Sequence, residues 1–211
     1  MLLQNAKLLM NSFIRYMLQF FLRPRNDVLA TKKFQKVLVI DLDETLVHAT
    51  LKAAPNCDMR IEVVLNGCSY IFHVLKRPYA ELFLQTVSRW YEIVIFTASL
   101  QQYADAVIDR LDPYNEVVQR RHFRESCIAD GAGFVKDLRK IRCDVRNTII
   151  IDNSPVAYSV NPENAVPIVG FIDDPHDRAL LDLLPFLEVM RYVKDVRNVL
   201  GLRLLSTSTA V

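Results

Sequence analysis

Three short apolar segments, each followed by polar residues, constrain the fold more than any other feature of this sequence. The segments VLVI (37–40), IVIF (93–96) and TIII (148–151) are almost entirely apolar and too short for helices, as is typical of strands buried on both faces. Helical patterns lie between them, over about 78–89 and 99–110. This alternation predicts an α/β fold with a central parallel sheet and helices on both faces.

Further segments complete the predicted fold. Residues 60–74 contain two β-rich runs around an Asn-Gly pair, which predicts a β-hairpin with a tight turn. A fourth strand is predicted over 165–171, and Pro167 places it at an edge of the sheet or shortens it. Residues 178–200 predict a C-terminal helical region that bends or breaks near Pro185.

Polar side chains follow the three buried strands at the point where each strand ends. They are Asp41 and Asp43, Thr97 and Ser99, and Asp152 and Asn153. Ligands in such folds bind at the carboxyl ends of the strands, so these side chains are expected to converge there. Clustered carboxylates repel unless a cation lies among them, and Asp and Asn oxygens suit Mg²⁺. Ser99 has a second interpretation, because with Gln102 it forms a capping box that predicts the cap of the following helix.

A metal ion beside carboxylates, with a hydroxyl and a lysine nearby, suits phosphoryl transfer. Lys136, in the sequence GFVKDL, is the candidate for the additional cation. Its spacing alone does not distinguish this role from that of a solvated loop lysine.

The bulk composition fits a single globular domain. The chain has 211 residues, of which 51% are hydrophobic and 24% charged, and this composition excludes a disordered protein. A net charge of +2 gives no reason to expect direct nucleic-acid binding. The 4 cysteines lie far apart without metal-ligand spacing, which indicates reduced thiols rather than disulfides.

Residues 1–25 differ from the rest of the chain, because apolar residues recur every three or four positions and no acidic residue precedes Asp27. The apolar run is shorter than the roughly 20 residues that span a bilayer. A basic amphipathic helix on a membrane surface, a helix packed on the domain and a mitochondrial transit peptide all fit this pattern. We therefore predict an N-terminal helix that is a possible membrane anchor (1–25), a linker (26–35), a catalytic domain (36–201) and a disordered tail (202–211).

Several short motifs occur together. In order, they are DLDET (41–45), FTAS (96–99), FRESC (123–127), VKDL (135–138), DNSP (152–155) and NAVPI (164–168). This set resembles the haloacid dehalogenase-like phosphatases, in particular the branch that acts on phosphoserine and phosphothreonine in proteins and includes the RNA polymerase C-terminal-domain phosphatases. The resemblance implies a Rossmann-like three-layer sandwich with a central parallel sheet, a small β-hairpin insertion and no large cap domain.

The resemblance also implies an aspartyl-phosphate mechanism that depends on Mg²⁺. Asp41 would be the nucleophile, while Asp43 would protonate the departing Ser or Thr oxygen and then activate the hydrolytic water. The implied metal ligands are Asp41, the backbone carbonyl of Asp43, Asn153 and, directly or through water, Asp152.

Substrate contacts follow from the same resemblance. Thr97 and Lys136 would bind phosphoryl oxygens, and Arg124 and Tyr103 would flank the substrate. Only 53 residues separate Asp43 from Thr97, and 38 separate Thr97 from Lys136, so neither interval holds a large cap. An open site suits a phosphoprotein better than a small metabolite.

Within this branch, residues 76–99 and 179–200 most resemble the Dullard group of nuclear-envelope phosphatases. Members of that group carry a membrane-binding N-terminal segment and are implicated in dephosphorylating lipin-type phosphatidate phosphatases together with a small regulatory membrane subunit. The resemblance implies a location at the endoplasmic reticulum or nuclear envelope, facing the cytosol or nucleus. This chain departs from the group at residues 24–35 and 48–58, which bear on the substrate and the partner, but no catalytic motif position is substituted.

Two other functions remain open. One is a soluble nuclear phosphatase that acts on the polymerase C-terminal domain. The other is a binding module similar to the presequence-receptor subunit of the mitochondrial translocase, which shares this fold. The complete set of motif residues favours an enzyme over the binding module.

Overall fold

The computed structural model describes residues 36–54, 56–202 and 204. The predicted N-terminal helix (1–25), the linker (26–35) and most of the predicted tail lie outside the described residues. Within the described ranges, no helix is long and apolar enough to cross a bilayer.

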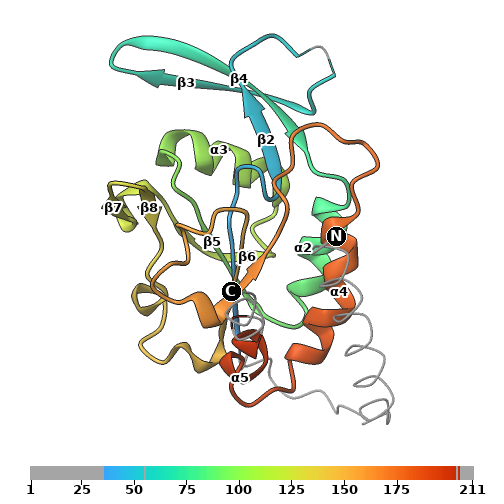
Figure 1. Ribbon diagram of the computed structural model, residues 1–211. Coiled ribbons are helices and arrows are strands. Elements are labelled where there is room, and N and C mark those ends of the chain that lie inside the picture. Colours follow the sequence, from blue (N-terminus) through green and yellow to red (C-terminus); the bar gives the residue numbers. More distant parts are fainter. Residues whose placement is uncertain (1–35, 55, 203, 205–211) are drawn as a thin grey trace, which may run out of the picture.

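A central sheet of five parallel strands has the order β10-β9-β1-β5-β6 (Figure 1). The strands are β1 (Val37–Ile40), β5 (Glu92–Phe96), β6 (Val118–His122), β9 (Thr148–Asp152) and β10 (Ala165–Pro167). The three apolar segments are confirmed as β1, β5 and β9, and the proline-containing strand is confirmed at an edge. Ile40 is in register with Ile95 on β5 and Ile151 on β9. The residues that follow these three isoleucines therefore meet at one edge of the sheet.

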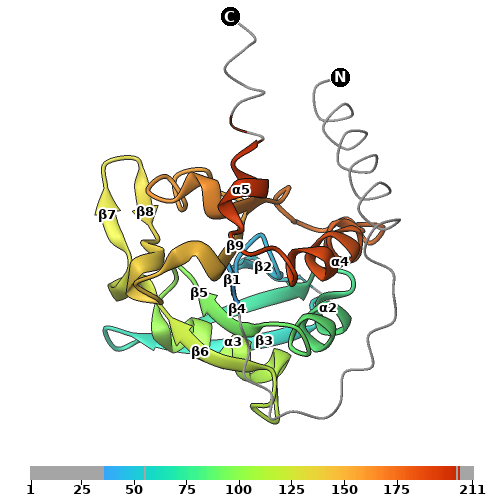
Figure 2. The ribbon, with the colours of Figure 1, turned by 90° about the horizontal axis from the view of Figure 1, so that it is seen from below.

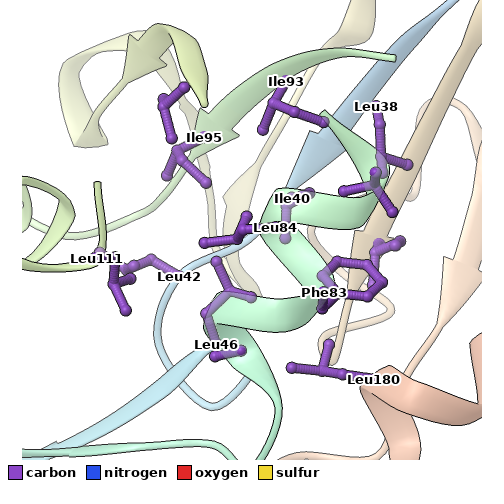
Figure 3. Packing of buried hydrophobic residues seen from close by; sticks show 14 of the residues in the cluster. Leu38, Ile40, Leu42, Leu46, Phe83, Leu84, Ile93, Ile95, Leu111 and Leu180 are labelled. Carbon is purple, nitrogen blue, oxygen red and sulfur yellow. The ribbon is translucent and has the colours of Figure 1, made fainter. Parts of the chain in front are cut away.

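The two faces of the sheet are covered by different kinds of structure. The α-helices are α2 (Ala80–Val87), α3 (Gln101–Leu111), α4 (Ala179–Met190) and α5 (Arg197–Leu200). They cover one face, where Leu38 packs in a core cluster with Phe83 and other apolar residues (Figure 3). On the other face, Val39 packs with Leu138 and Ile141, which belong to short 3₁₀ helices and loops. The 3₁₀ helices are η1 (Arg124–Ser126), η2 (Leu138–Lys140), η3 (Val145–Asn147) and η4 (Pro162–Asn164).

Two small antiparallel sheets are added to this frame. The first comprises β2 (Val47–Thr50), β3 (Met59–Leu65) and β4 (Cys68–Lys76), and the second β7 (Ile128–Asp130) and β8 (Gly133–Val135). The predicted hairpin is confirmed as β3–β4, with Asn66 and Gly67 at positive φ of 51° and 79°. Figure 1 shows this hairpin beyond one end of the central sheet. In the view of Figure 2, β7–β8 lies on the opposite side of the sheet from α2 and α4.

Two local predictions need correction, and one strand was not predicted. The capping box is wrong, because α3 begins after Leu100 without a side-chain cap and Ser99 donates its hydroxyl elsewhere. The helix does not break near Pro185, because α4 continues through Pro185 and the helical region is interrupted only after Met190, while the bend stays a prediction. β6 was not predicted from the sequence, because two of its side chains are arginines, Arg120 and Arg121, that pair with acidic residues of β5 and α3.

Arg77, just after β4, is a buried cation that ties the inserted sheet to the central fold. Its side chain donates to both carboxylate oxygens of Asp177, at 2.8 Å and 2.7 Å. It also donates to the carbonyls of Thr45 and Val169, at 3.2 Å and 2.9 Å. Arg77 thereby fixes the segment after Asp43 against the segment that follows β10.

We predict that Arg77→Met lowers the free energy of unfolding by about 3 kcal/mol or more, because one carboxylate and two carbonyls lose their donor. Equilibrium urea unfolding measures this change. The matched control is Arg146→Met, which removes the exposed pair with Asp144 and should leave the urea midpoint near that of the wild type. A loss below about 1 kcal/mol for Arg77→Met would contradict a structural role for the buried pair.

Candidate active site

A cavity of about 330 Å³ opens at the carboxyl ends of β1, β5 and β9. Its lining contains Asp41, Asp43, Thr97, Arg124, Lys136, Asp152 and Asn153, all singled out from the sequence. It also contains Glu44, Ala98, Ser99, Phe134, Ser154 and Ala157. Tyr103 is outside this lining, but its hydroxyl reaches Asp43. The structure thus brings the candidate residues together, and their roles remain proposals.

Lys136 joins two strand ends at the floor of the cavity. Its Nζ donates to Asp41 Oδ1 at 2.5 Å and to Asp152 Oδ2 at 2.7 Å. All three side chains are largely buried, with 2%, 9% and 1% of their surface exposed for Lys136, Asp41 and Asp152. Burial lowers the pKa of Lys136, but the two carboxylates outweigh burial and raise it, so the ammonium stays charged. Burial, then the charge of Asp41, raises the pKa of Asp152, and Lys136 opposes that rise.

The local backbone explains why these three groups meet. Asp41 continues the β1–β9 ladder, donating its amide to the Ile151 carbonyl at 3.0 Å. The second oxygen of Asp152 accepts from the Ser154 amide at 2.8 Å, which orients this carboxylate at the end of its strand. Lys136 follows β8, and its own amide donates to the Ala157 carbonyl at 2.7 Å.

Asp43 is held in a different environment from Asp41. Its two oxygens accept from the Tyr103 hydroxyl at 2.7 Å and from the Ser99 hydroxyl at 2.6 Å. Burial raises the pKa of Asp43, and these two hydrogen bonds oppose the increase. Burial, followed by the adjacent Asp43 charge, raises the pKa of Tyr103, so that hydroxyl remains a neutral donor. A carboxyl with a raised pKa beside a cavity is suited to general acid–base chemistry.

Thr97 and Arg124 present hydrogen-bond donors to the cavity. The Thr97 hydroxyl accepts from the Ser99 amide at 3.0 Å, which leaves its own proton available to a ligand. Arg124 Nε donates to the Ala98 carbonyl at 2.6 Å, and its guanidinium lies 5.2 Å from the Phe134 ring centroid. Among the described residues, neither terminal nitrogen of Arg124 has a hydrogen-bond partner, so both can bind an oxygen of a ligand.

The oxygen donors in the cavity fit a magnesium ion supplemented by water. Within the described part of the chain, Asp41 Oδ2 and the Asn153 side chain have no hydrogen-bond partner, although both residues line the cavity. The same residues include no group of three or more His, Cys, Asp or Glu side chains that could hold a metal by themselves. Mg²⁺ accepts a smaller protein set, because it binds through one or two carboxylates and keeps several waters. The residues that could hold it are Asp41, the Asp43 carbonyl, Asn153 and Asp152.

Sequence reasoning left one contributor to the site open and missed another. Ser99 was expected to converge with the other strand-end side chains, but the capping box gave it a second role as a helix cap. Glu44 lines the cavity with its backbone in the left-handed region, at φ 56°, a conformation that no sequence signal predicted.

Comparison with known proteins identifies the family. The sequence model of the NLI interacting factor-like phosphatase family matches residues 36–197 of this chain. CTD nuclear envelope phosphatase 1B of Danio rerio is 42% identical over 175 residues, which cover 79% of this chain and 71% of that protein. The CTD nuclear envelope phosphatase 1 homolog of Caenorhabditis elegans is 44% identical with the same coverage. Nuclear envelope morphology protein 1 of Saccharomyces cerevisiae is 43% identical, but only 43% of its length is covered.

Solved structures agree on the fold. The fission yeast RNA polymerase II CTD phosphatase Fcp1 bound to beryllium fluoride has a TM-score of 0.57 at 20% identity, over 82% of this chain and 55% of that one. A second Fcp1 structure has a TM-score of 0.56 at 22% identity, over 81% and 53% of the two chains. The predicted α/β fold with a central parallel sheet and no large cap is confirmed within the described residues. The chain therefore belongs to the NLI interacting factor-like phosphatase family, and it is an enzyme of the phosphatase class with a haloacid dehalogenase-like fold.

Proposed function

We propose that the chain is a Mg²⁺-dependent protein serine/threonine phosphatase that acts through an aspartyl-phosphate on Asp41. The observation that carries this proposal is the difference between two neighbouring carboxylates in one cavity. Asp41 is paired with the Lys136 ammonium, whereas Asp43 is held by two neutral hydroxyls. Because their environments differ in this way, Asp41 suits the role of nucleophile and Asp43 suits the role of general acid and base.

Asp41 has the position and the free oxygen of a nucleophile. In the described residues its Oδ2 has no hydrogen-bond partner, so this atom can attack phosphorus while Oδ1 stays bonded to Lys136. The new bond joins Asp41 to phosphorus, and the bond from phosphorus to the Ser or Thr oxygen breaks. Lys136 and the Thr97 hydroxyl bind the equatorial phosphoryl oxygens and stabilise their charge.

Asp43 moves the protons. Its protonated form gives a proton to the departing Ser or Thr oxygen, and its ionised form then takes a proton from the water that hydrolyses the acyl-phosphate. Ser99 and Tyr103 hold the carboxylate in one orientation through both steps. When bound by Asp41, the Asp43 carbonyl, Asn153 and Asp152, Mg²⁺ would supply positive charge that reduces repulsion between carboxylate and phosphate.

A cysteine nucleophile is less suited to this site. Cys127 lies near it, but burial raises the pKa of the Cys127 thiol and its Sγ donates to the Thr97 carbonyl at 3.7 Å. The thiol is therefore held neutral, and only thiolates are good nucleophiles.

The substrate class and location are proposed from the open site and the relatives. Within the described residues no cap domain covers the cavity, which leaves room for a phosphorylated segment of a protein. Relatives with names that include nuclear envelope support a location at the endoplasmic reticulum or nuclear envelope. The resemblance of residues 76–99 and 179–200 to the Dullard group is the basis for proposing a lipin-type protein as the substrate. We also propose membrane contact through residues 1–25 and a small regulatory membrane subunit.

The roles of the two aspartates can be separated with Asp43→Asn. With p-nitrophenyl phosphate, a good leaving group that needs no proton, this variant should release about one equivalent of p-nitrophenolate in a burst and then turn over slowly. With a phosphoserine peptide it should show no burst, because the serine oxygen leaves unprotonated. Rapid-mixing absorbance measures the release of p-nitrophenolate, and rapid quenching followed by chromatography measures the dephosphorylated peptide, because the phosphoryl group stays on Asp41 in this step. The matched variant Asp41→Asn should show neither burst nor turnover, and full activity in it would overturn the proposal.

The metal assignment predicts that chelation abolishes phosphatase activity and that added Mg²⁺ restores it. Asn153→Ala should raise the Mg²⁺ concentration for half-maximal activity at least about tenfold, a typical cost of losing a group that supports a metal. Asn198→Ala, an exposed amide on α5, is the control and should leave the titration unchanged. Activity that survives exhaustive chelation would rule out the metal-dependent mechanism.

A further inference from the structure

A second cavity, of about 420 Å³, lies beside the catalytic one on the inserted three-stranded sheet. It is lined by side chains of β2, β4 and two loops, among them His48, Thr50, His73, Leu75 and Ile172. Its volume is in the range of about 300–1,000 Å³ that is usual for ligand pockets. Nothing in the proposed chemistry uses this cavity.

The strand pairing shows that this cavity is on the face of the inserted sheet that α3 does not cover. His48 pairs with Leu75, and Thr50 pairs with His73, so these four side chains lie on one face. The opposite face packs towards α3, where the Phe72 ring lies 4.8 Å from the ring of Tyr103. The second cavity is therefore separate from the contacts that hold Asp43.

One side-chain pair links the two cavities. Glu44 lines the catalytic cavity, His48 lines the second, and His48 Nδ1 lies 3.2 Å from Glu44 Oε1. Glu44 lies in the turn that follows Asp43, and His48 lies on β2, directly after this turn. A chain bound with its phosphoryl group in the first cavity can thus continue over this pair into the second.

The far wall of the second cavity is held in place by buried contacts. Ile172 and Asp173 belong to the segment after β10, which lies beside β2 in Figure 1. The neighbouring Phe171 amide donates to the Glu44 carbonyl at 2.8 Å. Arg77 fixes the two ends of this segment through the Val169 carbonyl and the Asp177 carboxylate. The wall is therefore preformed, which lowers the entropic cost of binding.

The lining combines apolar side chains with the polar side chains of His48, Thr50, Asn56 and His73, and its apolar part can receive an uncharged apolar group. Ala53, Ala54, Leu75 and Ile172 supply apolar surface, and Ile172 is 51% exposed. Lys52 and Asp173 bring one charge of each sign, so the lining does not favour an anion or a cation. Farther along the same face of the sheet, Ile71 and Val64 are 51% and 64% exposed and extend the apolar surface.

We propose that the second cavity binds an apolar side chain of the phosphoprotein substrate, close in sequence to its phosphorylated residue. This inference rests on the proposed protein phosphatase function. The catalytic cavity recognises the phosphoryl group, and the second cavity recognises the flanking sequence. The phosphatase then prefers phosphorylated sites in which the substrate segment that crosses the Glu44–His48 pair carries an apolar residue into the second cavity.

Cys57 lines the second cavity and gives a direct test in the wild-type protein. Peptides carry a non-hydrolysable phosphonate in place of the phosphoryl group and a bromoacetyl group at successive positions on either side. Mass spectrometry should find Cys57 alkylated at least about tenfold faster than exposed Cys143 for one or two of these positions. Equal rates at every position, or the same Cys57 rate with a phosphonate-free peptide, would overturn the proposal.

A kinetic comparison tests the same cavity independently. Ile172→Asp should lower the ratio of kcat/KM for an apolar phosphoserine peptide to kcat/KM for p-nitrophenyl phosphate at least about tenfold. Leu82→Asp is the matched control, because Leu82 is 48% exposed on α2, and its ratio should equal that of the wild type. An unchanged ratio in folded Ile172→Asp rejects the second subsite while leaving the phosphatase proposal intact. Failure of the wild type to hydrolyse any phosphopeptide would instead reject the proposed function itself.

Discussion

The buried contact of Lys136 with Asp41 and Asp152 is the interaction on which the rest of the site depends. It places one ammonium between the ends of β1 and β9, with hydrogen bonds of 2.5 Å and 2.7 Å. Removing these charges from water is costly, and the cost is offset only while the three groups stay together. Two carboxyl groups share one ammonium here, an arrangement to which a further cation in the cavity can add favourable charge. The parallel register of β1 and β9 is what holds the two carboxylates at the same level.

A second buried cation, Arg77, organises the surroundings of the site. Lys136 acts at the floor of the catalytic cavity, whereas Arg77 joins the turn after Asp43 to the segment that follows β10. The segment from Asp43 to His48 consequently has little freedom. It sets Asp43 towards Ser99 and Tyr103, sets Glu44 towards the catalytic cavity, and presents His48 to the neighbouring cavity. The six consecutive residues from Asp43 to His48 thereby join catalysis to the proposed recognition of the flanking sequence.

The sequence predicted those parts of the structure that local patterns encode. Local patterns predicted the strands β1, β5 and β9 from their apolar runs and the β3–β4 hairpin from its Asn-Gly turn. The polar residues at the strand ends predicted a site at one edge of the sheet. β6 could not be predicted, because its arginines are satisfied by ion pairs with residues of β5 and α3. Lys136 was a candidate from its residue type, but its position between two carboxylates depends on the β7–β8 hairpin and on long-range packing. Ser99 and Arg77 likewise contact residues that are distant in sequence, so local sequence patterns could not predict these contacts.

Trapping the covalent intermediate is the most direct test of an aspartyl-phosphate on Asp41. The wild-type enzyme would be mixed with a phosphoserine peptide and Mg²⁺, quenched during turnover, and treated with borohydride, which reduces an acyl-phosphate to an alcohol. Peptide mass spectrometry then locates the reduced carboxyl group. We expect reduction at Asp41 alone, and only when the phosphopeptide is present. Reduction at Asp43 or Asp152, or the absence of a reduced carboxyl during sustained turnover, would contradict it.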